Sequence, residues 1–328
     1  MKIAVDAMGG DFAPGEIIAG VHLAIKENPI EIVLVGDQGR LEKAISAIPG
    51  FPYENVSIVH ASENVEMSDS PMESFKKKKD SSIRIGLELI KDKRAQGFVS
   101  AGNTGAVMLA STMLLGRISG IDRPAIAAVL PRKNGKVIVL DVGSNVDCKA
   151  KYLAQFAKMG SVYAEIVLDI KSPKVGLLNI GEEKSKGNFL TQSAFSLISG
   201  TSLNFIGNIE GKDVLSGHVD VVVCDGFVGN AILKFGEGAT NLFADFFKNE
   251  ARSSLMSKIG LLFLKPALRR FKKEYDYIEY GGAPLLGVSG ISIIAHGKSK
   301  SIAIKNAIKI CVKSINNNIV ERISEGIK

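Results

Sequence analysis

The sequence predicts an α/β fold built around a mostly parallel central sheet. Five apolar runs each end in a glycine-rich polar turn, and helical patterns follow the turns. Strands that alternate with helices are typical of parallel sheets. The chain has 328 residues, of which 46% are hydrophobic, so it has enough apolar side chains for a large core. Because parallel strands end at one edge of their sheet, we expect the five turns to meet in one crevice.

The five apolar runs have the length of short buried strands. They read KIAV, GFV, VIVL, VGLL and DVVV, and the turns that follow them are DAMGGD (6–11), SAGNTG (100–105), DVGSNVD (141–147), NIGEEKSKGN (179–188) and CDGFVGN (224–230). Glycines let a ligand approach the backbone closely, and the N–H groups that open the next helix favour an anion. Several such turns in one crevice predict an enzyme with an anionic ligand.

Five further strands and the helices between them complete the alternation. The strands are expected at 31–35, 56–60, 125–130, 203–206 and 291–295. Pro14 stands where a helix tolerates proline, so it opens the first helix, and the last helical pattern covers 298–323. The sequence contains no repeat of fixed period and no low-complexity linker, so we expect one domain over residues 1–328.

Residues 240–280 depart from this alternation, because they are helical and contain no strand. Their centre, 255–271, reads LMSKIGLLFLKPALRRF, in which apolar residues precede basic ones. Pro266 should break or kink the segment, so we expect a helical hairpin inserted in the domain and projecting from it. Its apolar side chains either pack in a dimer interface or core, or lie on an anionic membrane. The second alternative involves Leu255, Ile259, Leu261, Leu262, Lys265, Arg269 and Arg270.

The basic composition narrows the range of partners. A formal net charge of +7 suggests an acidic partner. The chain has no Trp, only 6% aromatic residues and no zinc-finger spacing, so we do not expect nucleic acid. Four consecutive lysines, Lys76–Lys79, lie in the polar connection 69–82. This connection is either a mobile solvated loop or a docking site for an acidic partner.

Several classes of protein are excluded by motifs that the chain lacks. No apolar stretch is long enough to cross a membrane, and the N-terminal MKIAVDAMGG has no signal-peptide organisation, so we expect a cytoplasmic protein. The three cysteines are far apart and the four histidines are scattered, which disfavours a disulfide framework and a metal site. P-loop, GxGxxG, GxSxG and HExxH motifs do not occur. Positioning and charge stabilisation remain as the means of catalysis.

Nine segments, in order along the whole chain, resemble the bacterial phosphate acyltransferases of phospholipid synthesis. They are VDAMGGDFAPGEII, SAGNTGA, RPAIAAVLP, LDVGSNVDCK, GLLNIGEEKSKGN, NFIGNIEGKDVLSG, DVVVCDGFVGNAILKFGEG, YGGAPLLGVSG and IAHGKS. The resemblance implies transfer of a long-chain acyl group from acyl carrier protein to inorganic phosphate, with acyl phosphate as the product. It also implies a sandwich fold like that of isocitrate and isopropylmalate dehydrogenases.

The resemblance further implies partners and a location. Members of the family are typically homodimers without a cofactor that associate peripherally with the membrane, where a glycerol-3-phosphate acyltransferase would use the acyl phosphate. Acyl carrier protein is strongly acidic, so Lys and Arg clusters would speed and orient its docking. The hairpin at 255–273 could serve the carrier protein, the membrane or both.

Phosphate is already a nucleophile near neutral pH, so the site must bind it, hold the thioester beside it and stabilise the oxyanion. We expect the amides of Asn103, Thr104 and Gly105 to bind phosphate, and the Asn103 and Thr104 side chains to add hydrogen bonds. A plain helix cap is the alternative for this turn. Lys186 is favoured over Lys184 to balance the phosphate charge or to steady the departing thiolate.

Other polar residues near the strand ends complete the expected site. His296 could donate a proton to the thiolate, or it could be structural. Acidic residues repel phosphate, so they would orient lysines and amides, bind the pantetheine arm of the carrier, or serve as plain turn caps. Besides those named above, the expected substrate-binding residues are Asp6, Gly9, Gly10, Asp11, Ser100, Gly102, Arg123, Asp141, Asn145, Glu182, Asp225, Gly226, Asn230 and Lys234.

Three other functions stay open at this point. A short-chain phosphate acyltransferase would use acyl-coenzyme A instead of the carrier protein. A non-catalytic module would bind acidic proteins or membranes through its basic surface, although it needs no convergent glycine turns. A dehydrogenase of the related fold is disfavoured, because no nicotinamide fingerprint and no metal-carboxylate cluster occurs.

Overall fold

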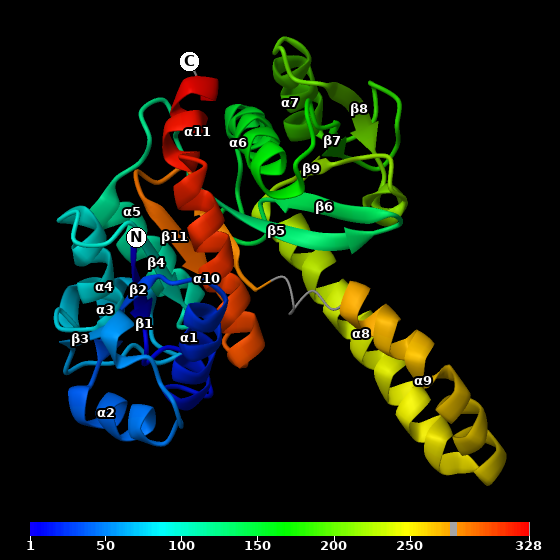
Figure 1. The fold of residues 1–328 in the computed structure, drawn as a ribbon. Coiled ribbons are helices and arrows are strands. Elements are labelled where there is room, and N and C mark those ends of the chain that lie inside the picture. Colours follow the sequence, from blue (N-terminus) through cyan, green and yellow to red (C-terminus); the bar gives the residue numbers. More distant parts are fainter. Residues whose placement is uncertain (276–280, 328) are drawn as a thin grey trace.

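The computed structural model describes residues 1–275 and 281–327 (Figure 1). Within these ranges, side chains are not described for Asn241, Ala244, 251–253, Leu255 and 269–275. One eleven-stranded sheet runs through the described residues, in the order β3-β2-β1-β4-β11-β10-β5-β6-β9-β7-β8. The α/β class and the mostly parallel sheet expected from the sequence are confirmed.

The strands are short, and most of them lie where the apolar runs predict them. They are β1 (Lys2–Asp6), β2 (Glu31–Gly36), β3 (Val56–His60), β4 (Gly97–Ser100), β5 (Ala125–Arg132), β6 (Gly135–Leu140), β7 (Val175–Leu178), β8 (Phe205–Ile209), β9 (Val221–Val223), β10 (Ala283–Leu286) and β11 (Ile291–Ile294). Strand β8 begins at Phe205 rather than at residue 203. Strand β10 was not predicted from the sequence. It has only four residues and contains Pro284, and proline is disfavoured within strands.

The sheet changes direction near its centre. Strand β10 is antiparallel to both β11 and β5, and β5 is antiparallel to β6, whereas all other pairs are parallel. The turns after β1 and β4 therefore leave the sheet in one direction, and the turns after β6, β7 and β9 leave it in the opposite direction. Both sets start from nearly the same level, because β10 pairs through Ala283 with Ile294 at the end of β11 and through Leu285 with Ile126, next to the pair of Ala127 and Leu140 at the end of β6. The expectation that all five strands run in one direction is wrong, and the shared crevice stays a prediction. The cause of the reversal is the connection 133–134 between β5 and β6, which is far shorter than the dozen or so residues that a parallel crossover needs.

Eleven α-helices and two short 3₁₀ helices occur among the described residues. The α-helices are α1 (Gly15–Glu27), α2 (Gln38–Ser46), α3 (Pro71–Lys77), α4 (Ser82–Lys91), α5 (Thr104–Leu115), α6 (Ala150–Leu168), α7 (Phe189–Ser199), α8 (Gly226–Ser253), α9 (Leu255–Tyr275), α10 (Ser301–Asn316) and α11 (Ile319–Ile327). The 3₁₀ helices are η1 (Tyr53–Asn55) and η2 (Gly211–Leu215).

The helices cover both faces of the sheet, because alternate strand residues point to opposite sides. In β1, Ile3 and Val5 pack in a cluster with α1 and α10, whereas Ala4 packs in a cluster with α4 and α5. In β6, Leu140 packs with α6 and α11, whereas Val139 belongs to the same cluster as Ala4. Helices α4 and α5 thus lie across the sheet from α1, α6, α10 and α11 (Figure 1).

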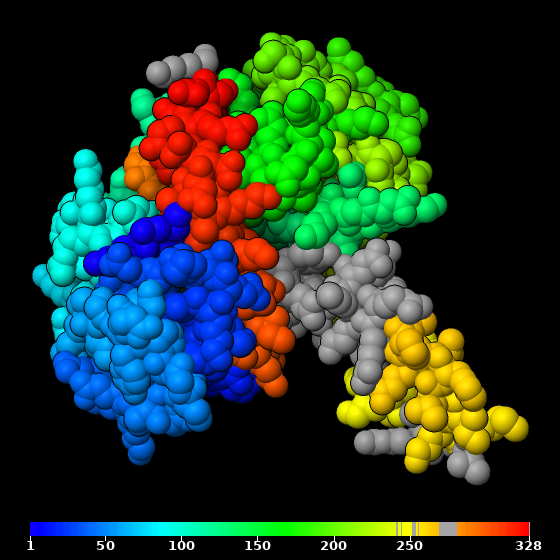
Figure 2. Space-filling view, in the orientation of Figure 1, coloured from blue at the N-terminus to red at the C-terminus, as the bar shows by residue number. Residues whose placement is uncertain are grey.

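Helices α8 and α9 pack against each other and project from the body as an arm (Figures 1 and 2). Helix α8 begins at Gly226, directly after β9, and Ser254 separates it from α9. The Ser254 hydroxyl accepts a hydrogen bond from the N–H of Ser257 at 3.0 Å, as an N-cap does. Pro266 lies inside α9, so the break expected there does not occur, and the chain turns at the Ser254 cap instead. Residues 276–280 of the expected hairpin lie outside the described residues.

The arm carries large apolar side chains on its surface. Met256 and Phe263 are each 81% exposed, and Leu262 is 64% exposed. A concentration of exposed apolar side chains marks a surface that contacts another molecule. No described helix combines the length and the apolar character that are needed to cross a bilayer.

Candidate active site

Three loops meet where β1, β4 and β11 end. The Ser100 hydroxyl donates a hydrogen bond to Asp6 Oδ2 at 2.6 Å and joins the first two of them. The N–H of Asp11 donates to the Gly297 carbonyl at 2.8 Å and joins the first loop to the third. The common direction of these strands therefore brings ten expected site residues together. They are Asp6, Gly9, Gly10, Asp11, Ser100, Gly102, Asn103, Thr104, Gly105 and His296.

Asp6 shapes two of these loops from inside the core. Its Oδ1 accepts hydrogen bonds from the N–H groups of Met8 and Gly9, each at 3.1 Å. The Ser100 hydroxyl that donates to Asp6 also accepts from the N–H of Gly102 at 3.0 Å. Burial raises the pKa of the Asp6 carboxyl, and the hydrogen bonds from Ser100 and the backbone lower it by less. Because Asp6 is buried, it acts on a ligand only through the loops that it holds.

The raised pKa of Asp6 predicts a specific pH dependence of stability. The unfolded chain releases this proton before the folded chain does, so the stability contributed by the neutral carboxyl is complete below the ordinary pKa of 3.8. That contribution is lost as the pH rises through the higher pKa of the folded chain. Urea unfolding between about pH 4 and pH 8 should show this loss in the wild type and not in Asp6→Asn. Parallel stability curves for the two proteins would contradict the assignment.

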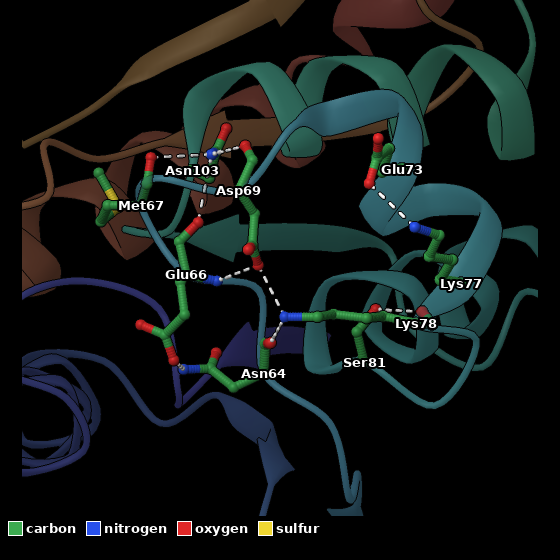
Figure 3. A network of polar contacts seen from close by, with 9 residues as sticks. All are labelled: Asn64, Glu66, Met67, Asp69, Glu73, Lys77, Lys78, Ser81 and Asn103. Carbon is green, nitrogen blue, oxygen red and sulfur yellow. Dashed lines mark hydrogen bonds and ion pairs between the residues drawn. The ribbon is translucent and has the colours of Figure 1, made fainter.

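The turn 100–105 opens α5, and Asn103 is its cap. Asn103 Oδ1 accepts a hydrogen bond from the N–H of Ala106 at 3.0 Å, so its side chain caps the helix. Its Nδ2 donates to the backbone carbonyls of Glu66 at 3.3 Å, Met67 at 3.1 Å and Asp69 at 3.0 Å (Figure 3). The Asn103 side chain is therefore fully engaged within the chain.

Thr104 and Gly105 form the first turn of α5. First-turn N–H groups have no partner within their own helix, and they attract anions. In the described part of the chain, no other group accepts a hydrogen bond from either N–H, and Thr104 is exposed. A Cβ on Gly105 would lie 2.7 Å from Pro71 Cγ, so the start of α3 closes one side of this turn. The turn thus offers a ligand its backbone rather than the Asn103 side chain.

The connection 69–82 is not an unstructured loop. It contains α3, and Lys78 Nζ donates to the Asn64 carbonyl at 2.6 Å and to Asp69 Oδ2 at 2.7 Å (Figure 3). Lys76 and Lys79 are exposed, so a docking role for them stays a prediction.

His296 lies on the loop after β11, beside the turns 6–11 and 100–105. Its Nδ1 accepts a hydrogen bond from the N–H of Lys298 at 3.1 Å, which leaves Nε2 to carry the proton of a neutral ring. The ring is exposed, and Nε2 has no hydrogen-bond partner among the described residues. The geometry leaves the Nε2–H available to donate a hydrogen bond to a ligand.

A second group of turns follows β6 and β9, which run opposite to β1 and β4, and this group is organised by Asp141. This carboxylate is 0% exposed and accepts hydrogen bonds from six donor groups, each between 2.6 and 3.3 Å. The donors are the N–H groups of Ile126, Gly143, Ser144 and Asn145, the Ser144 hydroxyl and the Asn145 side-chain amide. Asp141 therefore determines the shape of the turn 141–147.

The turn 224–230 packs directly on the turn 141–147. The N–H of Gly226 donates to the Asn145 carbonyl at 2.7 Å, and Asp225 caps α8 by accepting from the N–H of Val228 at 2.9 Å. Asn230 is exposed near Gly143, so it remains available to a ligand. Lys234, the other residue expected there, is paired with Glu237, at 2.9 Å between Nζ and Oε2.

Arg123 lies in a hollow next to this second group. The hollow has a volume of about 510 Å³ and is lined by Thr112, Met113, Arg117, Asp122, Arg123, Pro124 and Tyr152. The Asn145 side chain donates to the Pro124 carbonyl at 2.8 Å, which fixes the hollow against the turn 141–147. Arg123 is exposed, whereas Arg117 donates to the Asp122 carbonyl.

The turn 179–188 distinguishes its two lysines. Lys184 Nζ lies 5.6 Å from the centre of the Phe195 ring on α7, a cation–π contact. Lys186 is exposed, and the stem of its side chain lies beside Gly181, whose added Cβ would be 2.9 Å from Lys186 Cγ. Glu182, expected in the site, is also exposed. The ammonium of Lys186 has no partner among the described residues, and the preference for Lys186 stays a prediction.

Comparison with known proteins places the chain in a family. A profile described as "Fatty acid synthesis protein" matches residues 1–322. A phosphate acyltransferase of Heliobacterium modesticaldum is 50% identical over 327 residues, which are 100% of this chain and 98% of the relative. One of Moorella thermoacetica is 50% identical over 325 residues, which are 99% and 95% of the two chains. The chain belongs to the phosphate acyltransferase family. It is therefore an acyltransferase, and the resemblance of the nine segments is confirmed.

Solved structures share the fold of this phosphate acyltransferase. A phosphotransacetylase from Streptococcus pyogenes aligns with a TM-score of 0.67 at 17% identity, over 96% of this chain and 94% of the other. A 4-hydroxythreonine-4-phosphate dehydrogenase from Klebsiella pneumoniae aligns with a TM-score of 0.53 at 15% identity, over 97% and 99%. At such identities the likeness concerns the fold alone. The more specific likeness to isocitrate and isopropylmalate dehydrogenases stays a prediction.

The cysteines of the phosphate acyltransferase are poor nucleophiles. Burial, followed by the charges of Asp141 and Asp225, raises the pKa of Cys148 to about 12. Burial also raises the pKa values of Cys224 and Cys311. A thiol attacks as its thiolate, so a raised pKa removes the reactive form at neutral pH.

Several residues around the candidate site could not be recognised from the sequence. Glu66, Met67 and Asp69 contact Asn103 through backbone carbonyls. Contacts of this kind leave no side-chain motif in the sequence. Ser144 supports Asp141 from within a quoted motif, so only its role was missed.

The arm residues expected to contact a membrane or a carrier protein are only partly described. Ile259, Leu262 and Lys265 are exposed, and Leu261 is half-buried. The side chains of Leu255, Arg269 and Arg270 lie outside the described residues.

Proposed function

We propose that this chain transfers a long-chain acyl group from acyl carrier protein to inorganic phosphate and forms acyl phosphate. The full-length likeness to proteins named phosphate acyltransferase carries this proposal. The match to a fatty acid synthesis family favours a fatty acyl group. The net charge of +7 favours an acidic donor such as acyl carrier protein.

In the proposed reaction, phosphate attacks the thioester directly. An oxygen of hydrogen phosphate forms a bond to the thioester carbonyl carbon, the carbon–sulfur bond breaks, and the phosphate proton ends on the departing thiolate. Acyl phosphate and the free thiol are the only products, so the atoms balance without a cofactor. The high pKa values of the three thiols support this route over a cysteine-bound acyl intermediate.

Each described loop has a proposed task in this reaction. The N–H groups of Thr104 and Gly105 bind phosphate at the start of α5, and Asn103 holds that turn in place. The Nε2–H of His296 donates a hydrogen bond to the leaving thiolate, which takes the phosphate proton. Lys186 offsets the negative charge that develops in the transition state. Holding phosphate and thioester in the right geometry supplies up to roughly 7–11 kcal/mol of the barrier.

The turns around Asp141 and Asp225 are proposed to serve the thioester donor. They follow strands that run opposite to those before the turn 100–105, and they lie next to the hollow that contains Arg123. Arg123 and Asn230 are exposed there and offer a cation and an amide to a pantetheine arm. Asp141 and Gly226 shape these turns from inside.

The donor is tested with purified protein and hydroxylamine, which traps acyl phosphate as the hydroxamate. Palmitoyl carrier protein, acetyl-coenzyme A and butyryl-coenzyme A are compared, each with and without phosphate. We expect phosphate-dependent hydroxamate from the carrier-protein substrate. Product from the short coenzyme A thioesters alone would make the chain a short-chain phosphate acyltransferase. No product from any donor would contradict the proposed reaction.

The arm formed by α8 and α9 is proposed to hold the enzyme at a membrane as a peripheral protein. Its exposed apolar residues could enter the headgroup region, where a membrane-bound glycerol-3-phosphate acyltransferase would take up the acyl phosphate. A homodimer is also proposed, on the resemblance to the family.

Charging the arm should weaken membrane binding. Leu262→Glu with Phe263→Glu places two carboxylates on side chains that are 64% and 81% exposed, so membrane insertion becomes costly while folding is little affected. We expect sedimentation with vesicles containing anionic lipid to fall at least tenfold (about 1.4 kcal/mol). Leu215→Glu, on an exposed leucine of η2, is the control. Unchanged sedimentation of the arm variant would exclude the membrane role.

A further inference from the structure

Lys78 differs from the lysines on either side of it. Its side chain is 30% exposed, whereas that of Lys77 is 75% exposed and pairs with Glu73 on the same helix. The Lys78 ammonium donates to the Asn64 carbonyl at 2.6 Å and to Asp69 Oδ2 at 2.7 Å (Figure 3). Within the run Lys76–Lys79, the Lys78 ammonium therefore forms hydrogen bonds that belong to the fold.

The Lys78 ammonium closes the segment 64–69 into a compact loop. Asp69 Oδ2, which accepts from Lys78, also accepts from the N–H of Glu66 at 2.8 Å. The hydrogen bond from Lys78 and then that from Glu66 lower the pKa of Asp69, so the carboxylate keeps its charge at neutral pH. Charge-assisted hydrogen bonds of this kind are stronger than neutral ones.

The segment 64–69 contacts the turn 100–105, where phosphate is proposed to bind. Three of its carbonyls, those of Glu66, Met67 and Asp69, accept from Asn103 Nδ2, and the same residue caps α5 through Oδ1 (Figure 3). The Met67 side chain packs on the neighbouring loop, since a Cβ on Gly297 would lie 2.8 Å from Met67 Cε. The segment therefore contacts both the 100–105 turn and the loop that carries His296.

We propose that Lys78 is a positioning residue of the acyltransferase site, which holds the segment 64–69 as a latch on the turn that opens α5. With the latch closed, Asn103 keeps its rotamer and the N–H groups of Thr104 and Gly105 keep their direction. Without it, the three carbonyls move and the turn loses its orientation for phosphate. This inference rests on the proposed function, because it assumes that the turn binds phosphate.

The base of the surrounding loop does not depend on Lys78 Nζ. Asp80 accepts hydrogen bonds from the N–H and hydroxyl of Ser62, and its N–H donates to Glu63 Oε2 at 2.8 Å. The N–H of Glu63 donates back to the Asp80 carbonyl at 3.2 Å. Removing the Lys78 charge should therefore open the latch without unfolding the connection.

The test compares Lys78→Met, Lys78→Arg and the controls Lys76→Met and Lys79→Met, whose lysines are exposed. At saturating acyl donor, we expect Lys78→Met to raise the KM for phosphate about tenfold, with little change in the KM for the donor. Lys78→Arg should restore part of the loss, because a guanidinium can reach the same acceptors. Lys78→Met combined with Asn103→Ala should be no worse than the poorer single variant, because both act through one latch.

Two results would overturn the latch. One is a phosphate KM within twofold of wild type in Lys78→Met. The other is an equal rise of the phosphate KM in Lys79→Met, which would show that the effect comes from the total charge of the run Lys76–Lys79. Hydrogen exchange of the amides at 64–69 gives a reading that does not need activity, and it should accelerate only in Lys78→Met. If the wild type forms no acyl phosphate, the proposed function is wrong. If hydrogen exchange at 64–69 is the same in Lys78→Met as in the wild type, the latch is wrong, whatever the activity.

Discussion

Gly229→Ala is expected to lower the free energy of unfolding by about 3 kcal/mol or more. A Cβ at Gly229 would lie 1.9 Å from the Asp141 carbonyl oxygen and 3.0 Å from Cys224 Sγ. The nearest obstacle is backbone and cannot rotate away, so α8 would have to move off the turn 141–147. Urea unfolding of the purified variant, followed by circular dichroism, measures the loss.

Gly236→Ala is the matched control for this substitution. Gly236 lies in the same helix α8, and an added Cβ would meet nothing within 4 Å. Alanine is the better helix former, so this variant should be as stable as the wild type or up to about 1 kcal/mol more stable. Equal unfolding midpoints for the two variants would show that the contact between α8 and Asp141 is not tight.

Lys186→Ala is expected to lower kcat for acyl phosphate formation about 10²- to 10³-fold. The proposed role of the ammonium is to offset charge that appears only in the transition state, so its loss should reduce kcat more than it raises either KM. Initial rates over a range of both substrates separate these parameters. Because Lys186 is exposed, the thermal midpoint should not change.

Lys184→Ala removes a similar lysine from the same turn and serves as the control. Its ammonium is engaged with the Phe195 ring, at 5.6 Å, so it should contribute to the packing of α7 and little to kcat. A larger loss of kcat in Lys184→Ala than in Lys186→Ala would reverse the assignment of the two lysines.

The local part of the fold could be predicted from the sequence, because strands and turns leave local patterns. The apolar runs before Asp6, Ser100 and Asp141 lie in β1, β4 and β6. Strand direction could not be predicted in the same way, because it depends on how the halves of the chain pair. The two residues between β5 and β6 were the available signal for the reversal, since such a short connection permits only an antiparallel pair.

The candidate site could be predicted as a set of turns but not as a set of contacts. Asn103 carries both a cap signal and a ligand signal, and only the structure reveals that its amide is taken by three carbonyls. The run Lys76–Lys79 presents four equal side chains in sequence. Which one turns inward depends on where Asn64 and Asp69 lie in space, and no periodicity encodes that.

In the arm, a local sequence signal predicts the wrong position for a helix break. Proline is a strong helix breaker, yet Pro266 stands within α9 and the break falls at Ser254. The Ser254 cap offers a satisfied start for α9, and the pairing of α8 with α9 supports the rest of the helix. Tertiary contact can thus outweigh the local cost of a proline.

A single-turnover measurement tests the proposed direct attack of phosphate most sharply. Enzyme in excess is mixed with palmitoyl carrier protein, and the released thiol and the intact mass of the enzyme are followed with and without phosphate. We predict thiol release only when phosphate is present, matched by an equal amount of acyl phosphate, and no change in enzyme mass. A burst of thiol without phosphate, together with an enzyme heavier by one acyl group, would contradict direct attack and establish an acyl-enzyme.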